Sequence, residues 1–136
     1  MPSYLADTSA WNRSRLVAER WESLLEADEL ILCAPVALEL LYSARGAADY
    51  DSLARDLRGF RQFSIDERAE RAASRAQSGL AASSKHRGPT PVDLLIAAVA
   101  QVNDVPLLHY DRHFEVIAGV TGQPAEWLAP RGTLTS

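Results

Sequence analysis

Four carboxylate side chains stand at places in this sequence where a solvated surface acid is not the simplest explanation. They are Asp7, Glu39, Asp93 and Asp111. Asp7 and Asp111 come just after short apolar segments, and Glu39 is the only charge between residues 34 and 42. Carboxylates are good ligands for Mg²⁺ and Mn²⁺, and such cations activate water for attack on phosphorus. The four acids together predict a hard divalent cation that serves phosphodiester hydrolysis.

Each acid also has an ordinary structural explanation. Asp7 can cap the helix that follows it, and Asp93, three residues after Thr90, fits a capping box. Asp111 can form an Asx-turn, and Glu39 can simply face water. We favour a Glu39 that is buried with a partner over one that faces water, because its neighbours on both sides are apolar and ionised groups are rarely buried alone. Capping and metal binding can coexist in one carboxylate, so the fold must decide whether these acids meet.

Short apolar segments alternate with helical patterns along the chain. We expect strands at 3–6, 30–34 and 105–109, a short extended piece at 62–65 and an edge strand at 124–128. We expect helices at 16–27, 36–44, 49–63, 66–82 and 92–102, a loop at 83–90, and a turn or short helix from residue 111. This alternation predicts an α/β fold with a mainly parallel sheet covered by helices on both faces.

A parallel sheet would gather the four acids. Its strands end at one rim and the following helices begin there, so all four side chains should share that rim. Carboxylates gathered in this way raise one another's pKa values unless a cation neutralises them. The set contains no cysteine, which favours Mg²⁺, with Mn²⁺ as a substitute, over Zn²⁺.

Length and composition indicate one globular domain. The 136 residues fit a single domain at 1–130 followed by a flexible tail at 131–136. One cysteine, Cys33, excludes an internal disulfide, falls in an apolar segment and favours a cytoplasmic location. No apolar run is long enough to span a membrane. The net charge of −4 excludes nucleic-acid binding by bulk positive charge but permits a local basic patch.

Basic and aromatic residues near the expected rim are candidates for substrate contacts. Lys85 and Arg87 lie in the loop before the helix that carries Asp93, where they could bind backbone phosphates or be only solvated. The same alternatives apply to Arg13. Trp11 could stack on an unpaired base or anchor the core.

Four segments of the sequence resemble, in order, the PIN-domain ribonucleases, and among them the VapC-type toxins of bacterial toxin–antitoxin pairs. The matching segments are 4–9 (YLADTS), 36–41 (VALELL), 93–98 (DLLIAA) and 107–114 (LLHYDRHF). The resemblance implies an α/β/α sandwich with Asp7, Glu39, Asp93 and Asp111 as metal-binding acids, Asp7 and Asp93 most directly. It further implies that Thr8 or Ser9 helps to fix Asp7 or a metal-bound water.

The resemblance also implies an activity and partners. The family hydrolyses RNA to leave a 5′-phosphate and a 3′-hydroxyl, and its toxins form homodimers that a small antitoxin silences. Residues 16–27 and 38–53 are then candidate surfaces for that partner. This chain departs from the family by having His109 in place of a threonine or serine and His113 in place of a second acid. We therefore expect a weaker second metal site, or a pH-sensitive one if His109 faces the metal.

Two other functions fit parts of the pattern. A PIN-like domain without catalysis could serve only as an interaction partner, but the four intact acids argue against it. A receiver-like phospho-acceptor domain also gathers acids around Mg²⁺ at the rim of a sheet. Receivers need a lysine at the end of a late strand, and the only lysine here, Lys85, falls in a loop. A metal-dependent endoribonuclease is the function that the sequence favours.

Overall fold

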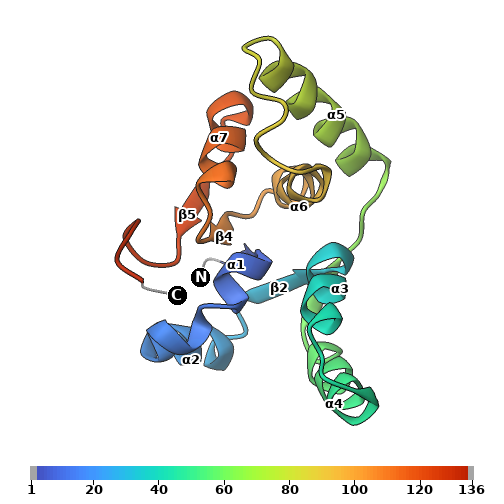
Figure 1. The fold of residues 1–136 in the computed structure, drawn as a ribbon, viewed down its shortest axis with the longest axis vertical. Helices are drawn as coiled ribbons and strands as arrows, with labels where there is room; N and C mark the ends of the chain where they lie inside the picture. The colour runs from blue at the N-terminus through green and yellow to red at the C-terminus, as the bar shows by residue number, and fades with distance from the viewer. Residues whose placement is uncertain (1–2, 135–136) are drawn as a thin grey trace.

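A computed structural model describes residues 3–134 of the chain (Figure 1). The strands are β1 (Tyr4–Ala6), β2 (Leu30–Cys33), β3 (Arg61–Phe63), β4 (Leu107–His109) and β5 (Ala125–Trp127). The helices are α1 (Thr8–Trp11), α2 (Ala18–Glu26), α3 (Ala34–Tyr42), α4 (Ala47–Leu57), α5 (Glu67–Ala81), α6 (Pro91–Val102) and α7 (Arg112–Thr121). A 3₁₀ turn, η1 (Ser14–Val17), leads into α2.

The strands form one sheet in the order β3-β2-β1-β4-β5, and every neighbouring pair is parallel. Leu5 of β1 lies opposite Ile31 of β2 on one side and Leu107 of β4 on the other. The chain therefore builds the sheet outward from β1 in one direction and later in the opposite direction. In open α/β sheets, ligands bind where the strand order reverses in this way, at the carboxyl ends of the strands.

Helices cover both faces of the sheet. Leu5 and Leu107 face a core shared with residues of α3, α5, α6 and α7. Ala6 and Leu108, the next residues along the same strands, face a second core shared with α1 and α2. Burying a leucine of this kind contributes about 1.5–3 kcal/mol, so β1 and β4 are held firmly from both sides. The expected three-layer α/β/α sandwich is confirmed (Figure 1).

Two elements differ from the expectation. The helix expected at 49–63 ends at Leu57, and the extended piece expected at 62–65 is an edge strand at 61–63 that pairs with β2. Arg61 and Gln62 are exposed, so this strand shows no apolar pattern in the sequence. The turn or short helix expected from residue 111 is a helix of ten residues, α7, which ends at Gly122 with φ of 74°. Glycine adopts this left-handed conformation readily, which stops the helix there.

The segment after residue 130 makes contacts, although a flexible tail was expected from 131. The backbone N–H of Leu134 donates to the hydroxyl of Tyr110 at 2.9 Å, and the hydroxyl of Thr133 donates to the carbonyl of Pro130 at 2.6 Å. Residues 135–136 of the expected tail lie outside the described residues. The chain is thus attached to the fold at least as far as Leu134.

The structure also bears on three smaller expectations, two of them about single side chains. Trp11 packs edge-on against Trp21 and Phe60, with ring centroids 5.0 Å and 5.2 Å away, so the core-anchor alternative is the one that the structure shows. Cys33 is fully buried in the core, as its apolar neighbours indicated. No helix within residues 3–134 is both long and apolar enough to cross a membrane.

Candidate functional site

Asp7 is a buried carboxylate at the carboxyl end of the central strand β1. It caps α1, and its Oδ2 accepts a hydrogen bond from the backbone N–H of Ser9 at 2.9 Å. The residue is only 4% exposed. Burial raises the pKa of the Asp7 carboxyl from 3.8 to about 6; hydrogen bonds from Ser9 oppose this shift, and the charge of Asp93 adds to it. Asp7 is therefore an acid whose negative charge the fold alone does not neutralise.

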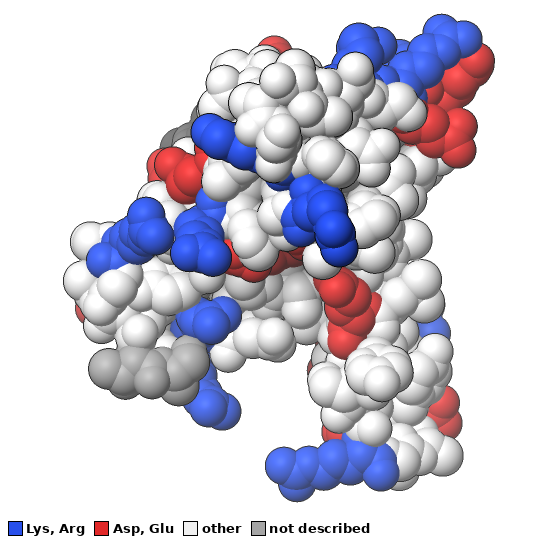
Figure 2. Space-filling view, turned by 45° about the horizontal axis from the view of Figure 1, so that its top comes forward, with Lys and Arg blue, Asp and Glu red and all other residues white. Residues whose placement is uncertain are grey.

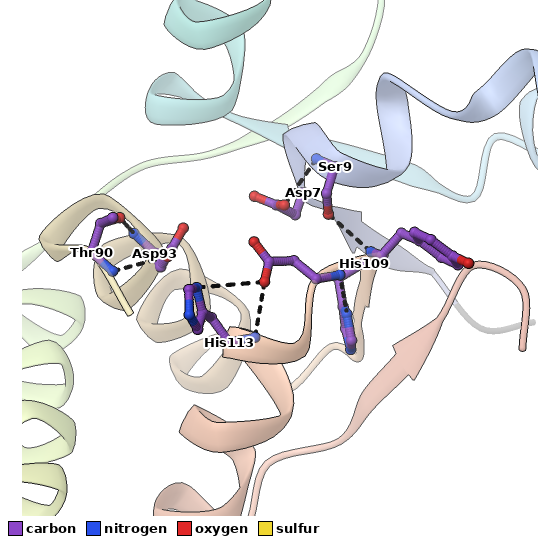
Figure 3. Close-up of polar contacts among 8 residues, drawn as sticks. Asp7, Ser9, Thr90, Asp93, His109 and His113 are labelled. Carbon is purple, nitrogen blue, oxygen red and sulfur yellow. Dashed lines mark hydrogen bonds and ion pairs between the residues drawn. The ribbon is translucent and has the colours of Figure 1, made fainter. Parts of the chain in front are cut away.

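Asp93 faces Asp7 from the first turn of α6. Its carboxylate accepts a hydrogen bond from the backbone N–H of Thr90 at 3.0 Å, and the Thr90 hydroxyl accepts one from the Asp93 N–H at 3.1 Å. This reciprocal pair is the capping box that the sequence predicted. Figure 3 shows the side chains of Asp7 and Asp93 directed toward the same space between β1 and α6. Capping orients the Asp93 carboxylate toward Asp7.

Asp111 reaches the same rim from the end of β4, the strand beside β1. It caps α7, because its Oδ1 accepts a hydrogen bond from the His113 N–H at 2.9 Å, and the same oxygen lies 3.5 Å from Nδ1 of His113. A hydrogen bond joins the turns that follow the two strands, because the Tyr110 N–H donates to Oγ of Ser9 at 2.9 Å (Figure 3). Ser9 thus links the turn that holds Asp7 to the turn that holds Asp111.

Glu39 lies on α3, and the expectation that it would be buried is wrong. The residue is exposed, but its Oε1 accepts a hydrogen bond from the hydroxyl of Thr8 at 2.7 Å. Thr8 follows Asp7 directly, so this bond connects α3 to the first turn of α1. Glu39 therefore faces solvent at the edge of the site, where this hydrogen bond holds it.

The four acids do not converge into one closed set of ligands. Within residues 3–134, no three Asp, Glu, His or Cys side chains come close enough together to hold one ion. The sequence left the number of ions open, and the rim need not hold all four acids on one cation. Mg²⁺ keeps several water ligands and commonly uses only one or two carboxylates, so the facing pair of Asp7 and Asp93 still fits it. In the described part of the chain, neither acid forms an ion pair with Lys, Arg or His. The ligand roles of the four acids remain predictions.

His109 does not face the acids, so the hypothesis of a histidine directed at the metal is wrong. Its ring is fully buried against the rings of Phe114 and Trp127. Nδ1 accepts a hydrogen bond from the Asp111 N–H at 3.2 Å, and Nε2 lies 2.9 Å from Oε2 of Glu115. Burial lowers the pKa of His109, and the Glu115 carboxylate partly opposes that shift. A neutral imidazole fits both contacts.

The role of Glu115 was missed at the sequence level. Strand alternation offered a signal for the orientation of His109, because residues 107 and 109 point to the same face and Leu107 belongs to the core. Nothing comparable identified Glu115 as the partner of His109. The contact depends on α7 beginning at Arg112, which places Glu115 in its first turn.

Basic side chains lie around the acids. Arg13 is held in place, with Nη1 donating to the carbonyl of Ser9 at 3.1 Å and Cζ lying 5.1 Å from the centre of the Tyr110 ring. Lys85 and Arg87 are exposed on the loop before α6. That loop passes close to α7, because a Cβ on Gly88 would lie 3.9 Å from Cδ2 of His113. Figure 2 shows acidic side chains near the middle of one face with Lys and Arg side chains on both sides of them.

Comparisons with known proteins agree with this arrangement. Ribonuclease VapC18 of Mycobacterium tuberculosis is 42% identical to the chain over 96% of it and 98% of the relative. Ribonuclease VapC51 of the same organism is 40% identical over 96% of each. DNA-bound VapBC from Salmonella typhimurium shares the fold with a TM-score of 0.73 and 18% identity, over 95% of this chain and 100% of the other. A sequence model described as PIN domain matches residues 4–120. The chain belongs to the PIN domain family.

Proposed function

We propose that this protein is a metal-dependent endoribonuclease and the toxin of a toxin–antitoxin pair. The observation that carries the proposal is the buried carboxylate of Asp7, which faces Asp93 where the strand order of the sheet reverses. Full-length relatives named ribonucleases support the reaction class. Solved structures of similar fold include VapBC from Salmonella typhimurium and VapBC-5, a member of the VapBC family of toxin–antitoxin systems, and they support the pairing with an antitoxin.

The residues present fit a hard divalent cation, which we propose to be Mg²⁺, with Mn²⁺ as a substitute. Asp7 and Asp93 would hold it, and Asp111 and Glu39 would complete the acidic rim. A bound Mg²⁺ supplies the positive charge that makes a water more acidic and stabilises charge on phosphoryl oxygens. Ser9 holds Asp7 in place through its backbone N–H, and Thr8 holds Glu39 through its hydroxyl.

The substrate is proposed to be held by its phosphates at the edge of the acidic rim. Lys85 and Arg87 are exposed on a loop that passes beside His113, next to Asp111. Arg13 lies beside the ends of β1 and β4 and is the third proposed contact. These side chains would position the RNA without reading its sequence. Because the net charge is negative, recognition of the RNA would depend on its shape as well as its charge.

The reaction is tested with the purified chain and a mixture of structured cellular RNAs. We expect internal cleavage in the presence of Mg²⁺ or Mn²⁺, no cleavage in EDTA, and recovery when Mg²⁺ is added in excess. The products should carry a 5′-phosphate and a 3′-hydroxyl, which ligation with end-specific RNA ligases detects. A folded protein that leaves every RNA intact with both metals would instead support the non-catalytic PIN-like interaction protein.

Replacing the two exposed basic residues of the loop should weaken RNA binding without stopping the reaction. In a Lys85→Ala/Arg87→Ala variant, we expect KM to rise several-fold while kcat stays close to that of the wild type. Each lost phosphate contact should lower the slope of log affinity against log salt by about 0.7 for single-stranded RNA. The matched control is Arg55→Ala, an exposed arginine on α4. An unchanged KM and salt slope in the loop variant would remove this loop from the binding surface.

The proposed partners are a small antitoxin and a second copy of the chain. Both surfaces that the sequence suggested for the antitoxin expose apolar side chains. Those on residues 16–27 are Leu16 and Leu25, and those on residues 38–53 are Leu38, Tyr42 and Tyr50. Tyr42 is 91% exposed, which is unusual for a large aromatic side chain with no partner to cover it. An RNA substrate and an antitoxin of this kind place the proposed activity in the cytoplasm.

A further inference from the structure

Four hydrogen-bonded contacts, linked through Ser9 and the backbone of Tyr110 and Asp111, connect Asp7 at the end of β1 with Glu115 on α7. Ser9 donates to Asp7 through its N–H and accepts at Oγ from the Tyr110 N–H. The next N–H along the chain, that of Asp111, donates to Nδ1 of His109, whose Nε2 contacts Glu115. The backbone turn that presents Asp111 is thus fixed by side chains on both of its flanks.

We propose that His109 is a positioning residue that sets the Asp111 carboxylate by accepting the Asp111 N–H, and that Glu115 selects the tautomer that lets it do so. The inference rests on the proposed function, because it concerns the geometry of the same site. A neutral imidazole has one donor and one acceptor nitrogen. When Glu115 accepts the proton on Nε2, Nδ1 is left as the acceptor that the Asp111 N–H requires.

The surroundings of the ring support this role over simple packing. His109 is fully buried between Phe114 and Trp127, a place that a purely apolar ring would fill at least as well. An apolar residue there would leave the Asp111 N–H without this acceptor. A backbone donor of that kind either costs free energy or turns to another acceptor. If the N–H turns, the Asp111 side chain turns with it, and the rim loses one of its acids.

Substitutions at His109 separate the two ring nitrogens. In His109→Asn, the amide oxygen takes the place of Nδ1 and can accept the Asp111 N–H. In His109→Gln, the amide nitrogen takes the place of Nε2, which keeps the contact with Glu115 and leaves Asp111 unbonded. We expect the Asn variant to keep most of the wild-type kcat. The Gln and Ala variants should lose about 10- to 100-fold, as is usual when the residues behind metal ligands are removed.

All three variants alter a buried site, so a measurement on the wild-type protein keeps the proposal testable. In ¹⁵N-labelled protein, we expect a scalar coupling through the hydrogen bond between the Asp111 amide nitrogen and Nδ1 of His109, with the ring proton on Nε2. This readout requires no RNA or metal, so it is independent of whether the proposed ribonuclease activity exists. A ring proton on Nδ1, or a Gln variant that is as active as the Asn variant, would overturn the proposal.

Glu115 provides the second half of the test. Glu115→Gln keeps an oxygen that can accept from Nε2, and it should preserve the tautomer and the cleavage rate. Glu115→Ala should populate the other tautomer in the ring ¹⁵N spectrum and lower kcat. The matched control is Glu70→Ala, an exposed glutamate on α5 for which no change is expected. An unchanged His109 spectrum in Glu115→Ala would show that Glu115 does not select the tautomer and would contradict that part of the proposal.

Discussion

Asp7→Asn is expected to abolish RNA cleavage and, at neutral pH without metal, to make the protein more stable. Cleavage should fall by more than about 100-fold, because loss of a proposed ligand should exceed the usual effect of the residues behind it. The structural role survives the change, since asparagine caps helices as well as aspartate does and its amide oxygen can still accept from Ser9. Activity and stability should therefore move in opposite directions.

The gain in stability follows from the sign of the pKa shift. The pKa of Asp7 in the folded state is about 6, above its ordinary 3.8, so the fold favours the protonated acid. The stability that Asp7 contributes to the folded state is fully present below pH 3.8 and is lost as the pH rises through 6. At pH 7 the charged form lowers the free energy of unfolding by about 3 kcal/mol, which the Asn variant should recover.

Denaturant unfolding in EDTA from pH 4 to pH 8 measures this difference. The two proteins should be equally stable near pH 4 and diverge as the pH rises. Burial also lowers the pKa of His109, but this residue affects the stability of both proteins equally and does not change the difference between them. In the wild type, Mg²⁺ should restore the lost stability, and in the variant it should have little effect. Asp66→Asn is the matched control, because Asp66 also caps a helix but is exposed. A variant that cleaves RNA normally would remove Asp7 from the site.

Asp93→Asn should also abolish cleavage, and its effect can be separated from helix capping. The asparagine oxygen can still accept the Thr90 N–H, so α6 should keep its cap and the free energy of unfolding should not fall. The loss of activity should again exceed about 100-fold, since a second proposed ligand is removed. Initial rates at saturating Mg²⁺, with circular dichroism to confirm folding, provide the measurement.

Thr90→Ala is the complementary variant. It removes the hydroxyl that accepts the Asp93 N–H but leaves the Asp93 charge in place. The free energy of unfolding should fall by about 1 kcal/mol, the usual effect of losing a helix cap. Cleavage should be reduced only modestly. The opposite pattern, with Asp93→Asn active and Thr90→Ala inactive, would mean that Asp93 serves only to cap α6.

The sequence predicted the parts of the site that depend on topology. Apolar strands at β1 and β4, each followed by an aspartate, required only that the sheet be parallel for Asp7 and Asp111 to share a rim. The capping box of Thr90 and Asp93 follows a local rule that holds in almost any fold. These features depend on chain direction and on short-range hydrogen bonding, which the sequence carries.

The orientation of individual side chains was harder to predict. Glu39 was expected to be buried because its neighbours are apolar, yet Leu38 beside it is itself 64% exposed. An apolar stretch therefore does not show which stripe of α3 faces the core. The contact between His109 and Glu115 exists only because α7 begins where it does. Such contacts arise from packing between elements and have no local pattern.

The position of β1 between β2 and β4 determines when the site can be completed during translation. Asp7 is translated well before β4, the strand that must lie beside β1 and that begins only at Leu107. Until then one flank of β1 is unpaired, and the rim has no Asp111. A nascent chain that stops before β4 therefore holds only part of the proposed nuclease. The cell that makes the protein contains the complete enzyme only after β4 has left the ribosome and paired with β1.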